Sequence, residues 1–246
     1  MISALQGEVS CYKIAGIPIA VRSPSGYICR LCADYATEDE PQYVFEITPA
    51  DIAQEREMAD GTDYSDGYLS SLALYRAFCT AVAERGVILF HSSAVSVDGK
   101  AYIFTAPSGT GKSTHTRLWR EVFGARAVMI NDDKPLIAFE DGRAVVYGTP
   151  WMGKHHLGAD MSAPIAGICF LSRGEENQIA RMPAGMILPR LLSQTFRPAP
   201  ADAMEKVLGV LVRLSASVPV WGLQCNMSPD AARVSYGAMS GENPTK

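Results

Sequence analysis

The sequence lacks the features that mark membrane-inserted and secreted proteins. Its apolar runs, such as Val87–Phe90 and Ile165–Leu171, are far shorter than the roughly 20 residues that span a bilayer. The N-terminus has no basic region followed by a sustained apolar stretch, so no secretory signal peptide is predicted. We therefore expect a cytoplasmic protein that has no membrane partner.

A basic excess and a disulfide framework are also missing. Lys and Arg number 22 against 26 Asp and Glu, which gives a formal net charge of −4 and predicts no nucleic-acid partner. The 6 cysteines show neither the density nor the secretory context of disulfide scaffolds, so reduced thiols are expected. The close pair Cys29 and Cys32 has no second pair to complete the four ligands of a structural zinc site.

The N-terminal part of the chain reads as a small β-rich subdomain. Its alternating residues predict a small antiparallel β layer. The polar stretch Gln54–Asp66 predicts a linker or mobile loop, and a helical period follows over Tyr68–Glu84. We therefore place the subdomain at residues 1–67 and the larger core at 68–246. The strands expected in the subdomain are Val9–Ala15, Ile17–Val21, Tyr27–Ala33 and Tyr43–Thr48.

The remaining residues predict an α/β core of a size that 246 residues can bury. Asp98-Gly99 and Asp141-Gly142 are typical hairpin turns. No internal repeat or low-complexity tract appears. The strands expected are Val87–Val97, Ala101–Thr105, Ala127–Ile130, Leu136–Phe139, Ala144–Tyr147, Ala163–Leu171 and Val220–Cys225, and the helices are Pro189–Thr195, Ala201–Ser215 and Pro229–Ala238.

The most informative segment is glycine-rich and lies between a predicted strand and a helical stretch, Thr114–Val122. It reads Ala-Pro-Ser-Gly-Thr-Gly-Lys-Ser-Thr from Ala106 to Thr114, the strand, loop, helix order of a phosphate-binding P-loop. Backbone N–H groups and a helix N-terminus can surround a phosphate chain there. In this pattern Lys112 reaches the β- and γ-phosphates and Ser113 holds Mg²⁺, so ATP and Mg²⁺ are expected. The binding residues predicted are Ser108, Gly109, Thr110, Gly111, Lys112, Ser113 and Thr114.

Two adjacent carboxylates follow the next buried strand. Asp132 and Asp133 follow the run Ala127–Ile130, and ligands of open α/β sheets bind beyond the carboxyl ends of strands. One carboxylate can help to hold Mg²⁺ and the other can accept a proton from an attacking hydroxyl. We favour Asp133 as the base and Asp132 as the metal-side residue.

Two further segments supply candidate residues. His91 ends an apolar run on the strand expected to pair with the P-loop strand, which would bring it near the phosphates. The glycine-rich segment Gly148–Lys154 predicts a formed loop, from which Lys154 can supply a second cation to a triphosphate. His155 and His156 are adjacent, so a shared metal is not expected. Lesser candidates are Arg117, Arg120 and Arg173, for each of which a surface or salt-bridging role is the simpler interpretation.

Together these motifs resemble the family that joins HPr kinase/phosphorylase to ATP-dependent phosphoenolpyruvate carboxykinase. The residues that carry the resemblance, in order, are His91-Ser92-Ser93-Ala94, Ser108–Ser113, Asp132-Asp133 and Gly148–Lys154. The order and approximate spacing agree over residues 87–156. Within the family the chain is most similar to short HPr kinase-like bacterial proteins, some of which phosphorylate a serine of a small ribosomal peptide.

The resemblance implies a P-loop nucleotide-binding core with a mixed sheet of the carboxykinase type. It also implies that His91 and one aspartate lie near the metal and the reacting phosphate, with Lys112 and Lys154 on the phosphates. The function predicted is ATP- and Mg²⁺-dependent phosphoryl transfer to a hydroxyl, most simply a serine of a peptide or protein. The alternatives are a nucleotide-binding regulatory module without transfer and a small-molecule kinase. A homo-oligomer is compatible with all of these readings.

Overall fold

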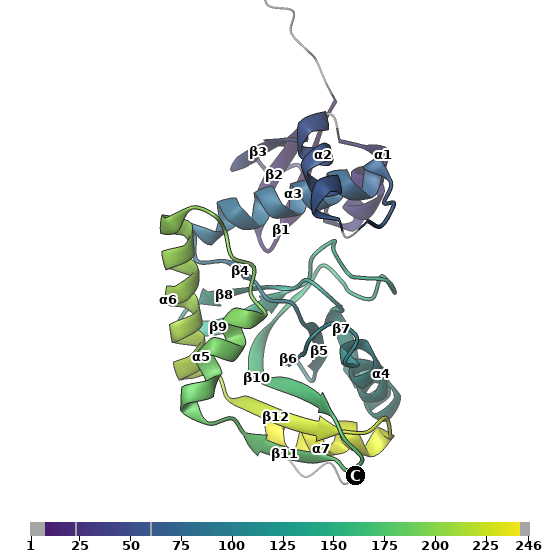
Figure 1. The fold of residues 1–246 in the computed structure, drawn as a ribbon, viewed down its shortest axis with the longest axis vertical. Helices are drawn as coiled ribbons and strands as arrows, with labels where there is room; N and C mark the ends of the chain where they lie inside the picture. Colours follow the sequence, from purple (N-terminus) through teal and green to yellow (C-terminus); the bar gives the residue numbers. More distant parts are fainter. Residues whose placement is uncertain (1–7, 23, 60, 242–246) are drawn as a thin grey trace, which may run out of the picture. The chain divides into compact units, whose positions relative to one another are not determined.

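The structure is a computed structural model that describes residues 8–22, 24–59 and 61–241. The chain has a mixed α/β fold and divides into two compact units, Met1–Ala81 and Val82–Lys246 (Figure 1). The sequence placed the boundary at residue 67, within the first turn of the long helix α3 (Asp66–Ala83), whereas nearly all of this helix belongs to the first unit. The residues on which the signal-peptide argument rested, 1–7, lie outside the described part of the chain.

The first unit contains a small three-stranded sheet with the order β1-β2-β3. The hairpin of β1 and β2 is antiparallel as expected, but β3 runs parallel to β2, so the expectation of a purely antiparallel layer was wrong. A helix between β2 and β3 reverses the chain and makes the parallel pairing possible. The strands are β1 (Val9–Ile14), β2 (Ile17–Arg22) and β3 (Tyr43–Glu46), and the helices besides α3 are α1 (Gly26–Leu31) and α2 (Pro49–Met58).

Local capping explains the two helices that the sequence analysis missed. The expected strand Tyr27–Ala33 is mostly α1, because the Ser25 hydroxyl accepts the Ile28 N–H and caps the helix. The expected linker Gln54–Asp66 overlaps the end of α2. Thr48 and Asp51 form a capping box at its start, a signal that was present in the sequence.

The second unit is built on one nine-stranded mixed sheet, curled in Figure 1. Its main path has the order β4-β8-β9-β10-β6-β5-β7, and β12 joins β10 and β11. Strand β10 pairs in parallel with both β6 and β12, whereas β5 is antiparallel to both β6 and β7. The strands are β4 (Ile88–Leu89), β5 (Ser93–Val97), β6 (Lys100–Thr105), β7 (Ala127–Asn131), β8 (Leu136–Glu140), β9 (Arg143–Tyr147), β10 (Ser162–Arg173), β11 (Gln178–Arg181) and β12 (Val220–Cys225).

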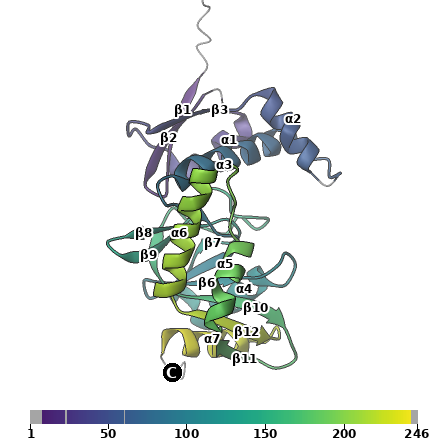
Figure 2. The ribbon, with the colours of Figure 1, turned by 60° about the vertical axis from the view of Figure 1, so that its left-hand side comes forward.

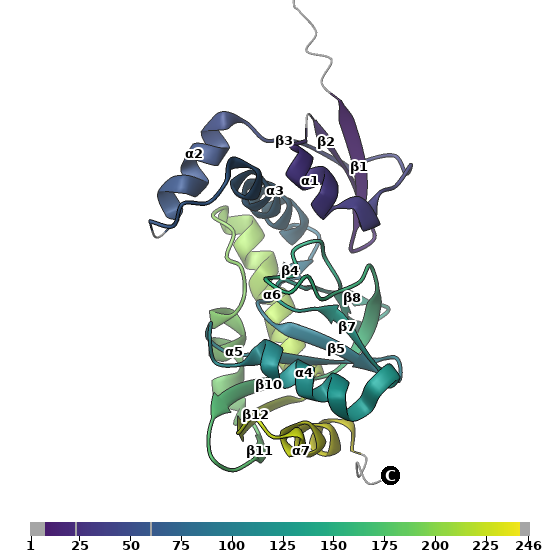
Figure 3. The same cartoon turned by 90° about the vertical axis from the view of Figure 1, so that its right-hand side faces the viewer.

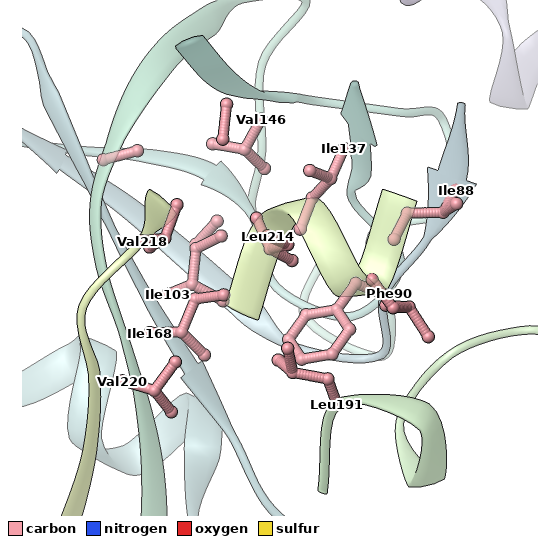
Figure 4. Close-up of a cluster of buried hydrophobic side chains, with 14 of the residues drawn as sticks. Ile88, Phe90, Ile103, Ile137, Val146, Ile168, Leu191, Leu214, Val218 and Val220 are labelled. Carbon is pink, nitrogen blue, oxygen red and sulfur yellow. The ribbon is translucent and has the colours of Figure 1, made fainter. Parts of the chain in front are cut away.

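Helices cover the two faces of this sheet in pairs. Figure 2 shows α5 (Ala184–Ser193) beside α6 (Ala201–Ser217), and Figure 3 shows α4 (Lys112–Phe123) near α7 (Pro229–Ser240). Successive side chains of a strand therefore point alternately to the two covered faces. Ile103 of β6 packs in the core under α5 and α6, drawn in Figure 4, whereas its neighbours Tyr102 and Phe104 pack in the core under α4 and α7. This alternation is the period-2 pattern of a sheet buried on both faces.

The helix α4 is held from behind by a buried polar contact with α7. The Trp119 indole N–H donates to the Ser235 hydroxyl at 2.9 Å, and His115 Nε2 lies 3.1 Å from the same oxygen. Burial lowers the pKa of His115 to about 3, so its imidazole is neutral at neutral pH. The middle of α4 is therefore fixed against the C-terminal helix.

Most of the elements expected in the core are present, with three differences. The expected strand Val87–Val97 is interrupted at His91 and Ser92, which lie between β4 and β5. The expected helix Pro189–Thr195 begins earlier, since α5 follows an N-cap at Pro183 and contains Pro189 in its interior. Strand β11 was not expected.

The segment between β9 and β10 turns back onto the end of β7. The Ala159 N–H donates to the Ile130 carbonyl, and Gly158 forms an isolated antiparallel β-bridge with Asn131. Gly148 makes this close return possible. A Cβ there would lie 1.9 Å from the Ala159 oxygen and 2.7 Å from the Ile130 oxygen, so no larger residue fits without moving backbone. We call residues 148–159 the arm.

We expect Gly148→Ala to lower the free energy of unfolding by about 1–3 kcal/mol, because the new methyl group overlaps two backbone carbonyls. Gly209→Ala is the matched control. Gly209 is an exposed interior residue of α6 whose added Cβ would meet no atom, so alanine should stabilise the protein by up to about 1 kcal/mol. Urea unfolding of the two variants measures both effects, and equal midpoints would contradict the packing described here.

Candidate functional site

The candidate site lies where three strand ends meet. Strand β5 begins beside the end of β6, with Ser93 opposite Phe104, and beside the end of β7, with Ala94 opposite Asn131. Because β5 is antiparallel to both neighbours, the residues before β5 face the residues that follow β6 and β7. His91, the glycine-rich segment and the two aspartates are thereby brought to one edge of the sheet.

The segment between β6 and α4, residues 106–111, is called the glycine loop below. Gly109 and Gly111 have φ angles of 76° and 125°, which favour glycine. Helix α4 begins at Lys112, and its N-cap Gly111 provides no side chain to bond the first N–H groups. These N–H groups and the positive end of the helix dipole are therefore available to an anion.

Lys112 lies inside this segment, with 8% of its surface exposed. Its ammonium donates to the Ala106 carbonyl at 3.1 Å. Burial lowers the pKa of Lys112, and the negative charges of Asp133 and Asp132 partly oppose that effect. The lysine thus sits between the glycine loop and the carboxylates.

Asp132 is bonded to hydroxyl groups from the start of β5 and from the first turn of α4. The Ser93 hydroxyl donates to Asp132 Oδ1 at 2.8 Å, and Ser113 forms a side-chain hydrogen bond with the same carboxyl. Burial raises the pKa of Asp132, and the two hydrogen bonds only partly offset the rise. The carboxyl of Asp132 therefore connects the start of β5 with the first turn of α4.

Asp133 has the opposite electrostatic environment. Its Oδ1 lies 3.3 Å from His91 Nε2, and its Oδ2 accepts a hydrogen bond from Lys134 Nζ at 2.7 Å. Burial by itself raises the pKa of this carboxyl, but His91 and Lys134 outweigh it and lower the pKa to about 2. The two neighbouring acids are thus shifted in opposite directions.

Hydrogen bonds of the backbone hold His91 in place. Its carbonyl accepts the Thr105 hydroxyl at 2.8 Å, and its N–H donates to the Gln194 carbonyl at 2.7 Å. Thr105 is the last residue of β6, directly before the glycine loop. His91 is therefore tied both to the loop strand and to the segment that follows α5.

The donor set of Asp132 and Ser113 fits a magnesium ion. Mg²⁺ is usually held by one or two carboxylates together with substrate phosphates and water, rather than by a complete cage of protein ligands. In the described part of the chain, no three His, Cys, Asp or Glu side chains gather into a fuller metal site. These oxygen ligands suit magnesium better than zinc.

The arm brings its backbone, but not its lysine, to the carboxylates. Gly153 has a φ of 72°, and a Cβ there would lie 3.0 Å from the Cβ of Asp133. Lys154, His155 and His156 are exposed. The electrostatic interaction with His155 lowers the pKa of Asp132. Among the described residues, no hydrogen bond or ion pair joins Lys154 to the site.

The three lesser arginine candidates have different surroundings. Arg117 pairs with Glu121 one turn further along α4 at 2.5 Å, as expected of a surface residue. Arg120 Nε is buried without a hydrogen-bond partner. Arg173 instead contacts the glycine loop.

Several site residues were missed by the sequence analysis. Lys134 follows the two aspartates directly and could have been considered for that reason. Asn131 organises this turn. Its Oδ1 accepts the N–H groups of Asp133 and Lys134, and its Nδ2 donates to Thr149 of the arm. Ser93 and Thr149 lie inside two of the quoted motifs but were given no role of their own, and Gln194 lies in none of them. The contacts that place these residues join parts of the chain that are far apart in sequence.

Comparison with known proteins gives a distant structural match. No family model and no curated sequence matches the chain. Among solved structures, the chain is similar to an Hpr(Ser) kinase/phosphatase from Coxiella burnetii with a TM-score of 0.33 and 10% sequence identity, over 62% of this chain and 99% of that one. Similarity at this level carries no argument about activity, so the proposals below depend on the residues of this chain. No helix in the described residues is both long and apolar enough to cross a membrane.

We expect Asp133→Asn to flatten the acid dependence of stability. The folded-state pKa is depressed to about 2, so the stabilisation is present above the unfolded-state pKa near 4 and is lost as the pH falls through 2. The difference in unfolding free energy between pH 6 and pH 2 should shrink by about 2 kcal/mol. Urea unfolding across this pH range measures it.

Matched lysine variants test the cause of the shift. Lys134→Ala removes the ion pair with Asp133 and should weaken the same acid dependence, whereas Lys154→Ala should leave it unchanged. Asp202→Asn, at the exposed start of α6, controls for loss of a carboxylate. An acid dependence of Asp133→Asn equal to that of the unmodified protein would show that Asp133 is not the stabilised carboxylate.

Proposed function

We propose that this protein is an ATP- and Mg²⁺-dependent kinase that transfers a phosphoryl group to a hydroxyl. The observation that carries the proposal is the contact of Asp132 with Ser113 at the start of α4, beside the Asp133–His91 pair. A phosphate cradle, a metal-side carboxylate and a second carboxylate thus share one edge of the sheet. These are the parts that phosphoryl transfer requires.

The glycine loop would act as a P-loop that binds the phosphates of ATP. Its free N–H groups and the N-terminus of α4 would face the β-phosphate, and Lys112 would neutralise charge that develops on the transferred group. The hydrogen bond from Lys112 to the Ala106 carbonyl keeps the ammonium at the loop before nucleotide binds. Ser108, Gly109, Thr110 and Thr114 complete the predicted binding segment.

Ser113 and Asp132 would hold the magnesium ion. A magnesium ion held there would supply positive charge to the phosphates of ATP. Ser93 contributes indirectly, since its donated hydrogen bond fixes the orientation of the Asp132 carboxyl. Asp132 is therefore the aspartate that we assign to the metal, because it is already bonded to Ser113.

Asp133 would accept the proton of the attacking hydroxyl. By pKa alone Asp132 is the stronger base, but its bond to Ser113 assigns it to the metal, and geometry takes precedence in choosing a base. Asp133 is ionised at neutral pH and so is able to accept a proton. Because phosphoryl transfer passes through a loose transition state, orientation of the acceptor matters more than strong basicity.

His91 and Lys134 would keep Asp133 charged and oriented. Lys134 is bonded directly to Asp133, whereas the sequence analysis considered only Lys154 as a second cation and placed it on the phosphates. We retain Lys154 as a second cation that the arm could bring to the phosphates. Lys134 is better supported as a site residue than Lys154, because it donates a hydrogen bond to Asp133.

The acceptor that we propose is a serine of a peptide or protein, as in HPr kinase-like enzymes. The support for this choice is the resemblance of the ordered motifs in the sequence. A small-molecule kinase would use the same residues with a different acceptor pocket. A nucleotide-binding module without transfer would leave the second carboxylate without a task.

We predict that Lys112→Ala abolishes ATP turnover while the protein stays folded. Loss of the ammonium removes charge stabilisation that is worth about 3–4 kcal/mol at similar electrostatic groups, or a rate loss of about 100- to 1000-fold. Lys206→Ala, on the exposed side of α6, serves as the matched control. Phosphate release from ATP measures both variants, and near-normal turnover in Lys112→Ala would refute the P-loop assignment.

A second prediction separates transfer from binding. Asp133→Asn should leave ATP affinity nearly unchanged and lower phosphoryl transfer by about 10²- to 10⁴-fold, as expected for loss of a general base. Asp132→Asn should instead weaken binding of Mg²⁺·ATP. Calorimetric ATP titration and transfer of labelled phosphate to candidate serine peptides measure the two quantities. If both variants change both quantities equally and slightly, the kinase reading fails and a binding module becomes the better account.

A further inference from the structure

We propose that Arg173 is a positioning residue that holds the glycine loop in its binding conformation. The inference rests on the proposed nucleotide-binding function and assigns to it a residue outside the binding motif. Sequence alone marks Arg173 only as a surface arginine after an apolar strand. The structure instead shows its guanidinium bonded to the loop.

The contact is made to two successive carbonyls. Arg173 Nη2 donates to the Gly109 oxygen at 2.5 Å, and Arg173 Nε donates to the Thr110 oxygen at 3.3 Å. The planar guanidinium presents its N–H groups as a fixed fork, which suits a pair of neighbouring acceptors. A lysine at this position could reach one carbonyl but would not hold both in a defined orientation.

The strand pairing places the arginine where it can make this contact. Strand β10 runs parallel to β6, with Phe170 opposite Thr105, so Arg173 lies beyond the end of β6 and beside the glycine loop. On the other side, Arg173 is paired with Cys225 of β12, and the Gly174 N–H donates to the Cys225 carbonyl. The arginine therefore projects from rigid backbone.

The contact matters because this loop is intrinsically flexible. Gly109 and Gly111 adopt positive φ values, and glycine loses more backbone freedom on ordering than any other residue. In a trans peptide the C=O and N–H groups point in opposite directions. Holding the Thr110 carbonyl therefore fixes the direction of the Gly111 N–H, while the Thr110 N–H is already bonded to the Pro107 carbonyl.

Preorganisation of this kind lowers the cost of binding. A loop that is ordered before the ligand arrives does not lose conformational entropy on binding, so affinity rises without a new ligand contact. In the described part of the chain, no carboxylate lies within ion-pair distance of Arg173. Its charge therefore also makes the potential at the loop more favourable to an anion.

The proposal predicts equal effects on ATP and ADP. Both nucleotides carry the α- and β-phosphates that the loop surrounds, so Arg173→Ala should weaken Mg²⁺-bound ADP and a non-hydrolysable ATP analogue alike, on the order of tenfold. KM for ATP should rise by a similar factor while kcat stays near its original value. Arg173→Lys should recover part of the affinity. Amide hydrogen exchange of residues 108–112 without nucleotide should become faster in Arg173→Ala.

Arg117→Ala is the matched control, since it removes an exposed arginine whose partner is Glu121. Calorimetric titration measures the affinities, and thermal unfolding checks that the variants are folded. Unchanged ADP and ATP affinities in Arg173→Ala would overturn the proposal. So would a loss confined to the ATP analogue, because that would indicate direct contact with the γ-phosphate. If the unmodified protein binds neither nucleotide, the proposed function itself fails.

Discussion

The antiparallel pairing of β5 with both β6 and β7 is the constraint on which the candidate site depends. It places the start of one strand against the ends of two others, so that short polar segments from distant parts of the chain meet. The hydrogen bond from Ser93 to Asp132 joins β5 to β7, and the hydrogen bond from Thr105 to His91 joins β6 to β5. A shift of β5 by one residue would turn these side chains to the opposite face of the sheet.

The two adjacent aspartates show how local surroundings separate chemically identical groups. Asp132 is buried among hydroxyls, which stabilise its charge less than burial destabilises it. Asp133 faces a histidine and a lysine, and these groups reverse the effect of burial. Neighbouring residues at a strand end point in different directions, which allows one dipeptide to have two environments. The turn formed by Asn131 preserves this divergence by bonding the backbone of the following two residues.

The sequence predicted the central part of this arrangement because its signals are local. The apolar runs of β6, β7 and β12 and the glycine-rich segment between β6 and α4 are readable within short windows. The hairpin at Asp98-Gly99 then placed His91 near the loop. Lys134, Gln194 and Arg173 could not be assigned in this way, because their contacts depend on sheet order and register. Helix α1 was missed because a single capping residue, Ser25, outweighed an apparently strand-like pattern. The parallel pairing of β3 was missed with it, because this helix reverses the chain between β2 and β3.

The buried contact of Trp119 with Ser235 has a consequence for motion. Helix α4 is fastened at its midpoint to α7, on the side of the sheet away from α5 and α6. Rigid-body displacement of α4 would have to break this contact and repack the aromatic core beneath it. The glycine loop connects β6 to α4 and the arm connects β9 to β10, so both segments begin and end on elements of the packed core. Adjustment of these two connections to a bound molecule would therefore leave the contact between α4 and α7 in place.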